Sequence, residues 1–310
     1  MAPLGAGKVG LFAAAAAGAA SEPAGYFGGG YVAAVVSTVD RFAFPSDSRT
    51  TLGTGLSVAR RLLAGMANSG TAGYFGGGTT GSDDDTVDKF AFSSDSRTTL
   101  GTGLSVARGW LAAMANSGTA GYFGGGYGPA DDTVDKFAFS DDSRTTLGTG
   151  LSAAVYFLAG MANSGTAGYF GGGTTGSGDV DTVDKFAFSD DSRTTLGTGL
   201  SAARRYLAAM ANSGTAGYFG GGSGYVDTVD KFAFSDDSRT TLGTGLSSAR
   251  GYLAGMADSG TAGYFGGGTT GSAVSTVDKF AFSDDSRTTL GTGLSAATTS
   301  LAGMANTDGL

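Results

Sequence analysis

The sequence predicts an all-β fold: a six-bladed β-propeller of four-stranded antiparallel blades, with the ring closed by the C-terminal strand. Near-identical units fill most of the 310 residues, and each starts with Gly-Tyr-Phe-Gly-Gly-Gly. These motifs begin at Gly25, Gly73, Gly121, Gly168, Gly217 and Gly263, so successive steps are 48, 48, 47, 49 and 46 residues. Within each unit, short runs alternate with period two between turn residues. Units of this length, built from several strands, are typical of propellers.

Each unit is expected to form four strands. In the third unit they are predicted at Leu111–Asn116, Ala120–Gly124, Thr133–Phe139 and Arg144–Thr149. Asn116-Ser117-Gly118 is a tight hairpin signal between the first two strands. Ser140-Asp141-Asp142-Ser143 turns the third strand into the fourth, with carboxylates suited to cap turn amides.

The phenylalanines predict the core. Of 20 Phe, 18 lie in the Tyr-Phe-Gly and Phe-Ala-Phe motifs, so they recur at the same places in every unit. On the third strand of unit three, Phe137 and Phe139 share one face, and Val134, Lys136 and Ala138 share the other. We therefore expect the phenylalanines to pack neighbouring sheets together and not to form a ligand stripe.

The strand order predicts how the ring closes. A well-formed first strand precedes units two to six, and one more, Leu301–Asn306, ends the chain. We expect it to complete the first blade beside Gly25–Gly29, which leaves residues 1–24 as an N-terminal apolar arm and 25–310 as the propeller. The alternative uses Ala13–Gly18 as the first blade's inner strand. C-terminal closure is favoured because Leu301–Asn306 retains the repeated motif.

Two resemblances follow from these motifs. The unit resembles a kelch repeat, because Gly-Tyr-Phe-Gly-Gly stands in the place of that family's strand ending in a double glycine. The run Val134-Asp135-Lys136-Phe137 is similar to the third strand of a kelch repeat, and Arg204 matches a common kelch position. Leu147 replaces the usual aromatic on strand four. The segment starting at Ser140 resembles the Asp-box of sialidase-type propellers, with matches at Ser140, Asp142 and Thr146 and departures at Arg144 and Leu147. That box marks a hairpin fold and implies no activity.

Composition narrows the function classes. The formal net charge of −8 disfavours a nucleic-acid partner. Cys and His are absent, which excludes disulfides, thiol nucleophiles, imidazole catalysis and the usual zinc sites, and no cofactor is expected. The apolar run Val9–Ala20 is too short to span a bilayer, so no membrane span is expected. It has features of a secretory signal and of a docking arm, and both readings stay open.

Binding residues are sought where the six copies differ. Differences collect in the loop between strands two and three and in the segment leading into strand one, and both connections are expected on one face of the ring. All six Tyr outside the Gly-Tyr-Phe motif, and the single Trp, lie in these segments. The binding-face candidates are Tyr31, Arg60, Arg108, Trp110, Tyr127, Tyr156, Phe157, Arg204, Tyr206, Tyr225 and Tyr252.

Aromatics crowded on one face suit sugar stacking or a protein partner. Alternatively, the loops vary because nothing constrains them, and the aromatics fill the ring mouth. Asp83, Asp84 and Asp85 are weak candidates for a Ca²⁺ site, since consecutive carboxylates in a loop are more often solvated charge.

No enzyme is expected. Kelch-like copper oxidases use His and Cys ligands, which the chain lacks. Sialidase-like hydrolysis needs a carboxylic acid, an activated Tyr and an Arg cluster, and no non-repeated acid–base pair stands out.

The sequence instead favours a non-catalytic interaction or structural propeller, extracellular or on a virion surface, as an adhesin, a decoration protein or a tail or fibre component. It would bind through the variable loop face, and residues 1–24 would hold a protein partner in a larger assembly. The alternatives are a lectin-like propeller that binds a surface glycan and, less favoured, a sialidase-like glycoside hydrolase.

Overall fold

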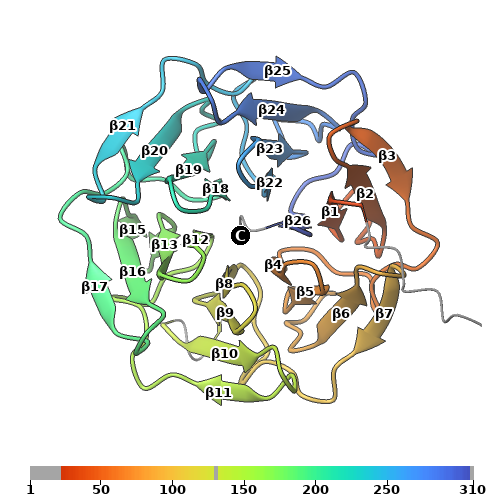
Figure 1. The fold of residues 1–310 in the computed structure, drawn as a ribbon, viewed down its shortest axis with the longest axis horizontal. Coiled ribbons are helices and arrows are strands. Elements are labelled where there is room, and N and C mark those ends of the chain that lie inside the picture. Colours follow the sequence, from red (N-terminus) through yellow and green to blue (C-terminus); the bar gives the residue numbers. More distant parts are fainter. Residues whose placement is uncertain (1–21, 129–131, 308–310) are drawn as a thin grey trace, which may run out of the picture.

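The computed structural model describes residues 22–128 and 132–307. The regular structure of these residues is entirely β, and it contains six four-stranded sheets and one short two-stranded hairpin. Figure 1 shows the six sheets arranged radially around one axis, with β4, β8, β12, β18, β22 and β26 innermost. The predicted all-β, six-bladed propeller is therefore confirmed.

The blades follow one another in chain order, and each is antiparallel throughout. From the axis outward, blade 1 is β26 (Ala302–Ala305), β1 (Ala24–Gly28), β2 (Val39–Ala43) and β3 (Ser48–Thr51). Blade 2 is β4 (Ala64–Asn68), β5 (Ala72–Gly76), β6 (Val87–Ala91) and β7 (Ser96–Thr99). Blade 3 is β8 (Ala112–Asn116), β9 (Ala120–Gly124), β10 (Val134–Ala138) and β11 (Arg144–Thr146).

The second half repeats this pattern, with one extra hairpin in blade 4. Blade 4 is β12 (Ala159–Asn163), β13 (Ala167–Gly171), β16 (Val183–Ala187) and β17 (Arg193–Thr195), with β14 (Thr174–Thr175) and β15 (Gly178–Asp179) in the loop before β16. Blade 5 is β18 (Ala208–Asn212), β19 (Ala216–Gly220), β20 (Val229–Ala233) and β21 (Arg239–Thr241). Blade 6 is β22 (Ala254–Asp258), β23 (Ala262–Gly266), β24 (Val277–Ala281) and β25 (Arg287–Thr289).

The C-terminal strand closes the ring as predicted. β26 pairs antiparallel with β1, and Met304 lies opposite Tyr26. The alternative inner strand, Ala13–Gly18, lies outside the described residues, as does most of the N-terminal arm. The last arm residue, Ala24, already belongs to β1.

Strand four is shorter than predicted. In blade 3 it ends at Thr146, where the prediction extended it to Thr149. Gly148 and Gly150 flank Thr149, and glycine has low strand propensity. Leu147 still donates a backbone hydrogen bond to the Val134 carbonyl at 2.9 Å, after which the chain leaves the sheet for the next blade.

Neighbouring blades are held together by the second strand, whose adjacent Tyr and Phe point to opposite faces. Tyr74 stacks on Phe139 of the following blade with ring centroids 5.3 Å apart. Phe75 packs toward the preceding blade, so closely that a Cβ on Gly28 would lie 2.7 Å from its ring. The 18 phenylalanines of the Tyr-Phe-Gly and Phe-Ala-Phe motifs are buried and form the core, as predicted.

A polar latch, a hydrogen bond from tyrosine to aspartate across the blade junction, repeats at all six junctions, and a lysine joins it at five of them, with Arg41 in its place between blades 1 and 2. The Tyr74 hydroxyl donates to Asp142 Oδ1 at 2.8 Å, and Lys89 Nζ donates to Oδ2 of the same carboxylate at 2.7 Å. Burial raises the pKa of Tyr74, and the hydrogen bond to Asp142 raises it further. At the junction that closes the ring, Tyr264 and Lys279 donate to Asp47 in the same way. The carboxylate in the turn that resembles an Asp-box therefore joins two blades.

A second carboxylate, on the third strand, lies inside each blade. Asp88 Oδ2 accepts from the Ser57 amide and hydroxyl, both at 2.9 Å, and from Arg60 Nη2 at 3.0 Å. Thr99 donates to the other oxygen at 2.7 Å. Ser57 and Arg60 lie on the linker from the preceding blade, so the carboxylate fixes that linker to the sheet.

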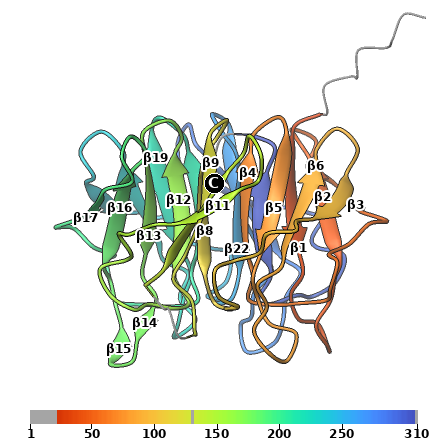
Figure 2. The ribbon, with the colours of Figure 1, turned by 90° about the horizontal axis from the view of Figure 1, so that it is seen from below.

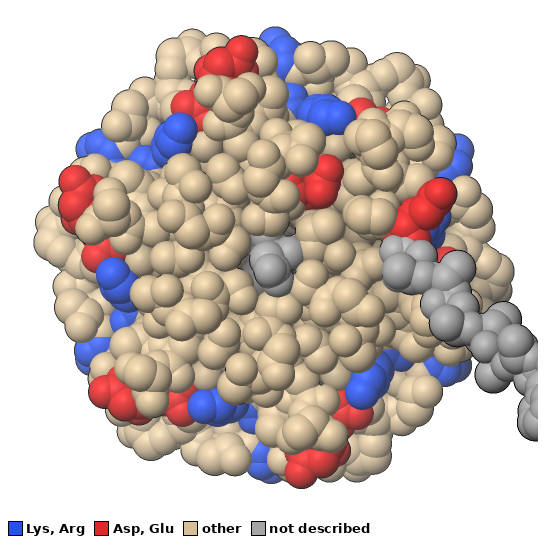
Figure 3. Space-filling view, in the orientation of Figure 1, with Lys and Arg blue, Asp and Glu red and all other residues tan. Residues whose placement is uncertain are grey.

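The two faces of the ring differ, as expected from comparing the copies. The loop between strands two and three pairs with the segment leading into strand one through isolated bridges such as Gly109↔Tyr127 and Tyr156↔Thr174, so both variable connections share one face. Figure 2 shows the β14–β15 hairpin projecting from this side. Figure 3 shows the opposite face, where most of the charged side chains lie toward the rim.

Candidate functional site

A closed circle of backbone hydrogen bonds surrounds the axis on the variable face. One residue from each linker contributes, and we call these six the mouth ring: Leu62, Trp110, Phe157, Tyr206, Tyr252 and Ser300. Each amide donates to the carbonyl of the preceding member at 2.8 to 3.1 Å, and Leu62 closes the circle by donating to Ser300 at 2.8 Å. The circle uses only main-chain atoms, so it does not depend on side-chain identity.

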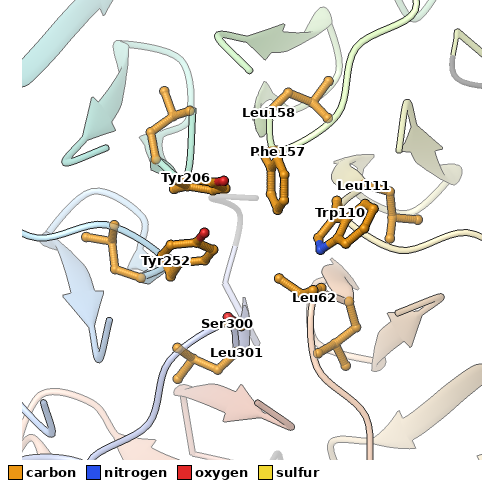
Figure 4. A pocket seen from close by; sticks show the side chains of 12 residues that line it. Leu62, Trp110, Leu111, Phe157, Leu158, Tyr206, Tyr252, Ser300 and Leu301 are labelled. Atoms are coloured by element: carbon orange, nitrogen blue, oxygen red, sulfur yellow. The ribbon is translucent and has the colours of Figure 1, made fainter. Parts of the chain in front are cut away.

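All six members of the mouth ring have left-handed backbone conformation, with φ between 58° and 61°. This region is uncommon for residues other than glycine, and for bulky side chains each occurrence costs about 1–3 kcal/mol. The hydrogen-bond circle offsets that cost. Backbone strain retained at six equivalent side-chain-bearing positions points to a functional use of the side chains. Figure 4 shows Trp110, Phe157, Tyr206 and Tyr252 gathered around the axial opening.

The aromatic members form a continuous arc over blades 3 to 6. Tyr206 and Tyr252 stack with centroids 3.8 Å apart, and Phe157 meets Tyr206 edge-on at 4.3 Å. Trp110 lies 5.0 Å from Phe157. Tyr127 and Tyr156 extend the arc outward, at 4.8 Å and 6.1 Å from Trp110. At blades 1 and 2 the arc is interrupted by Ser300 and Leu62, so the mouth has one aromatic side and one non-aromatic side.

Two cavities lie at this opening. The inner one, about 80 Å³, is enclosed by the mouth ring and by the leucine that follows each member, from Leu63 round to Leu301. The outer one is about 320 Å³ and is lined by Leu62, Trp110, Phe157, Tyr252 and Ser300, together with Arg61, Thr269 and Thr299. Its size falls at the lower end of small-ligand sites. Among the described residues that line the two cavities there is no carboxylate.

Two arginines flank the mouth. The Arg61 guanidinium lies over the Tyr31 ring at 5.0 Å and borders the outer cavity. Arg205 lies over the Tyr206 ring at 4.8 Å and pairs with Asp179 at 3.0 Å. The lining thus combines aromatic faces, the Arg61 guanidinium and hydroxyl groups. It suits stacking and hydrogen bonding more than acid–base chemistry.

The candidates predicted from sequence separate into two groups. Trp110, Phe157, Tyr206 and Tyr252 belong to the mouth ring, and Tyr31, Tyr127 and Tyr156 adjoin it. Tyr225 is 43 % exposed on its loop.

The remaining candidates do not lie on the face. Arg60, Arg108 and Arg204 are buried inside blades 2, 3 and 5 against Asp88, Asp135 and Asp230. This placement corrects their assignment to the binding face: these side chains are buried and fix the linker to the blade.

The three aspartates proposed as a weak metal site do not converge. The Asp84 carboxylate accepts the Thr86 amide at 2.6 Å, as in an ordinary loop turn. Burial raises the pKa of Asp83. In the described part of the chain, no group of three or more metal-ligating side chains occurs.

Sequence reasoning missed Arg61, Leu62, Arg205 and Ser300. These residues lie in the variable segments, so comparison of the copies pointed to the right place, but only aromatics and the repeated arginine were selected there. The left-handed conformation has no sequence signal in these copies, because glycine occupies none of the six mouth-ring positions.

The comparisons with known proteins add no family to the assignment of the fold. The chain matches no protein-family model and no curated protein. The likenesses to kelch repeats and Asp-boxes therefore stay resemblances. Within residues 22–128 and 132–307, no helix is long and apolar enough to cross a membrane.

Proposed function

We propose that the protein is a non-catalytic binding propeller, displayed outside the cell or on a virus particle, and that it holds its partner at the axial mouth. One observation carries the proposal: six strained, side-chain-bearing positions surround the axis, and their side chains differ while their backbone is the same. A rigid frame with variable side chains at one opening is the arrangement expected of a recognition site.

The chemistry of the lining favours a glycan as the partner. Flat aromatic faces stack on the C–H faces of sugars, and Arg61, Thr269 and Thr299 supply groups for sugar hydroxyls or an acidic sugar. No carboxylate occurs among the described residues that line the mouth, and this favours binding over glycoside hydrolysis, which uses at least one carboxylic acid. The arginines that a sialidase-like site would recruit are instead committed to buried aspartates.

The single Trp gives a direct assay. Because Trp110 belongs to the mouth ring, intrinsic tryptophan fluorescence reports on this site alone. We expect a glycan array to give hits whose free sugars shift or quench this fluorescence in a saturable way. An array without hits, or hits that leave the fluorescence unchanged, would remove the glycan proposal, and turnover of any glycoside would overturn the non-catalytic one.

Two variants separate binding from folding. Tyr252→Gly removes an aromatic side chain that lines the outer cavity, at a φ of 58°, which glycine adopts without strain, so the backbone circle should persist. We expect affinity to fall about tenfold or more, consistent with loss of one stacking contact of about 1–3 kcal/mol. Thr145→Ala, on the exposed outermost strand β11, is the matched control and should bind as the wild type does.

A further inference from the structure

The buried arginine described above is not present in every blade. Arg60, Arg108, Arg204 and Arg250 fill blades 2, 3, 5 and 6, each with Nη2 2.9 to 3.0 Å from the blade's aspartate. The equivalent positions in blades 4 and 1 are Val155 and Thr298. The aspartates of these two blades, Asp184 and Asp40, are nevertheless retained.

A pocket lies where each arginine is missing. The pocket of blade 4 is lined by Phe170, Val155, Val180 and Asp184, and that of blade 1 by Phe27, Thr298, Val36 and Asp40, which are the equivalent residues. Each cavity is about 30 Å³, larger than the roughly 10–15 Å³ that one water needs. Blades 1 and 4 face each other across the ring in Figure 1.

Compared with the carboxylates of the filled blades, the carboxylates in these pockets lack one hydrogen-bond donor, the buried arginine. Asp184 accepts from the Ser152 amide at 2.7 Å and hydroxyl at 2.8 Å, and from Thr195 at 2.6 Å. Arg193 on the outer strand reaches it at 3.5 Å. The buried guanidinium of the filled blades has no counterpart. The side chains of Asp40 and Asp184 are 6 % exposed, whereas the carboxylates of the four filled blades are 0 % exposed, so solvent reaches the vacated pockets.

The filled blades show what the pocket is shaped to hold. In blade 2 a single nitrogen, Arg60 Nη2, donates both to Asp88 and to the Phe75 carbonyl, each at 3.0 Å. The apolar residues that line the vacated pockets, such as Phe170 and Val180 in blade 4, match the flat, weakly hydrated guanidinium. A hard metal ion requires six or more oxygen ligands and a compact ammonium is strongly hydrated, so neither fits a pocket lined by one carboxylate, two or three hydroxyl groups and otherwise apolar side chains.

We propose that the pockets of blades 1 and 4 are two binding sites for a guanidinium group supplied from outside the ring, one per pocket. The group takes the place of the missing arginine head, donates to Asp184 or Asp40, and packs against Phe170 or Phe27. Its source is either a free alkylguanidinium compound or an arginine side chain of a partner. This proposal is independent of what the axial mouth binds.

Isothermal titration with methylguanidinium chloride at constant ionic strength tests the proposal, with methylammonium chloride as the matched cation. We expect saturable binding on the order of millimolar affinity with a stoichiometry of two, and at least tenfold weaker binding of methylammonium. A short peptide with one arginine, titrated in parallel, distinguishes the sources. Tighter binding of the peptide identifies a partner's arginine, and binding of methylguanidinium alone identifies a free compound.

Variants show whether the guanidinium binds in the pockets of blades 1 and 4. Val155→Arg should fill the blade 4 pocket from within and reduce the stoichiometry to one, and Thr298→Arg should do the same in blade 1. Arg204→Val should open a third pocket and raise the stoichiometry to three, which keeps the test decisive if an added arginine impairs folding. No saturable binding to the wild type, or a stoichiometry that these variants leave unchanged, would overturn the proposal.

Discussion

Replacing Arg108 by valine converts the filled pocket of blade 3 into the form that blade 4 already has. Arg108 is 1 % exposed and pairs with the fully buried Asp135 at 3.0 Å. Removing one partner of a buried ion pair costs about 3–5 kcal/mol. Asp135 keeps its hydrogen bonds from Ser105, at 2.9 and 2.8 Å, and from Thr146 at 2.7 Å, so we expect the lower end, about 3 kcal/mol. For a large domain this corresponds to a fall in Tm of about 6 °C.

Asp135→Asn and the double variant complete a thermodynamic cycle. Urea unfolding followed by far-ultraviolet circular dichroism gives the three free energies, and the double variant should lose about 2 kcal/mol less than the sum of the single losses. Additivity within about 0.5 kcal/mol, or a loss under about 1 kcal/mol for Arg108→Val, would refute the reasoning, because the ion pair would then contribute nothing specific.

The same cycle has a pH signature. Burial alone would raise the pKa of Asp135, but the hydrogen bonds from Ser105 and Thr146 and the charge of Arg108 outweigh it, and the pKa is lowered. The stabilisation is therefore fully present above the unfolded pKa of about 3.9 and is lost as the pH falls through the lower folded pKa. The difference in stability between wild type and Arg108→Val should be constant above about pH 5 and shrink below about pH 4.

Three further changes test other parts of the ring. Tyr122→Phe removes the hydroxyl that donates to Asp191 at 2.8 Å, so urea unfolding should show a loss of about 1 kcal/mol, and an unchanged midpoint would contradict the latch. Gly28→Ala places a methyl group 2.7 Å from Phe75 Cζ, and this overpacking should cost about 1–3 kcal/mol in the same assay; full stability would mean that the blades separate easily. Asp258 stands where the other copies have Asn, and burial raises its pKa, so the ionised carboxylate costs stability above the unfolded pKa. Asp258→Asn should raise Tm at pH 7, with the gain disappearing near about pH 3, and an equal gain at both pH values would exclude the charge as its cause.

The blades were predictable because their signals are local and repeated. Asn116-Ser117-Gly118 fixes a hairpin, the alternation around Phe137 fixes a strand, and each signal recurs in the other units with small changes. Ring closure was also predictable, since Leu301–Asn306 keeps the pattern of an inner strand and has no other sheet to join.

The site was only partly predictable, because its determinants are not local. The left-handed conformation of Trp110 and Tyr206 follows from a hydrogen-bond circle that joins residues about one blade apart, and a single copy contains no trace of it. The assignment of the buried arginines to the binding face was a different kind of error. They recur opposite an aspartate that every copy keeps, and recurrence among copies indicates a structural role. Arg250, which repeats the same pattern, shows that this signal was present in the sequence.

The two proposed sites share one structural element, the linker that enters each blade. Its main chain is held in the same way six times, by the conserved aspartate at one end and the mouth ring at the other. The backbone circle and the hydrogen bonds from serine to the blade aspartate do not use the side chains that vary, so blades 4 and 1 keep the same frame with Val155 and Thr298 at the arginine position. Val155 lies two residues before Phe157, and Thr298 two before Ser300, so each vacated pocket adjoins the mouth along the chain. A partner with an arginine close to its mouth-binding group would reach both sites from the same face. Its affinity would then depend on the mouth and on the vacated pocket together, so variants of one site alone would not reveal the whole effect.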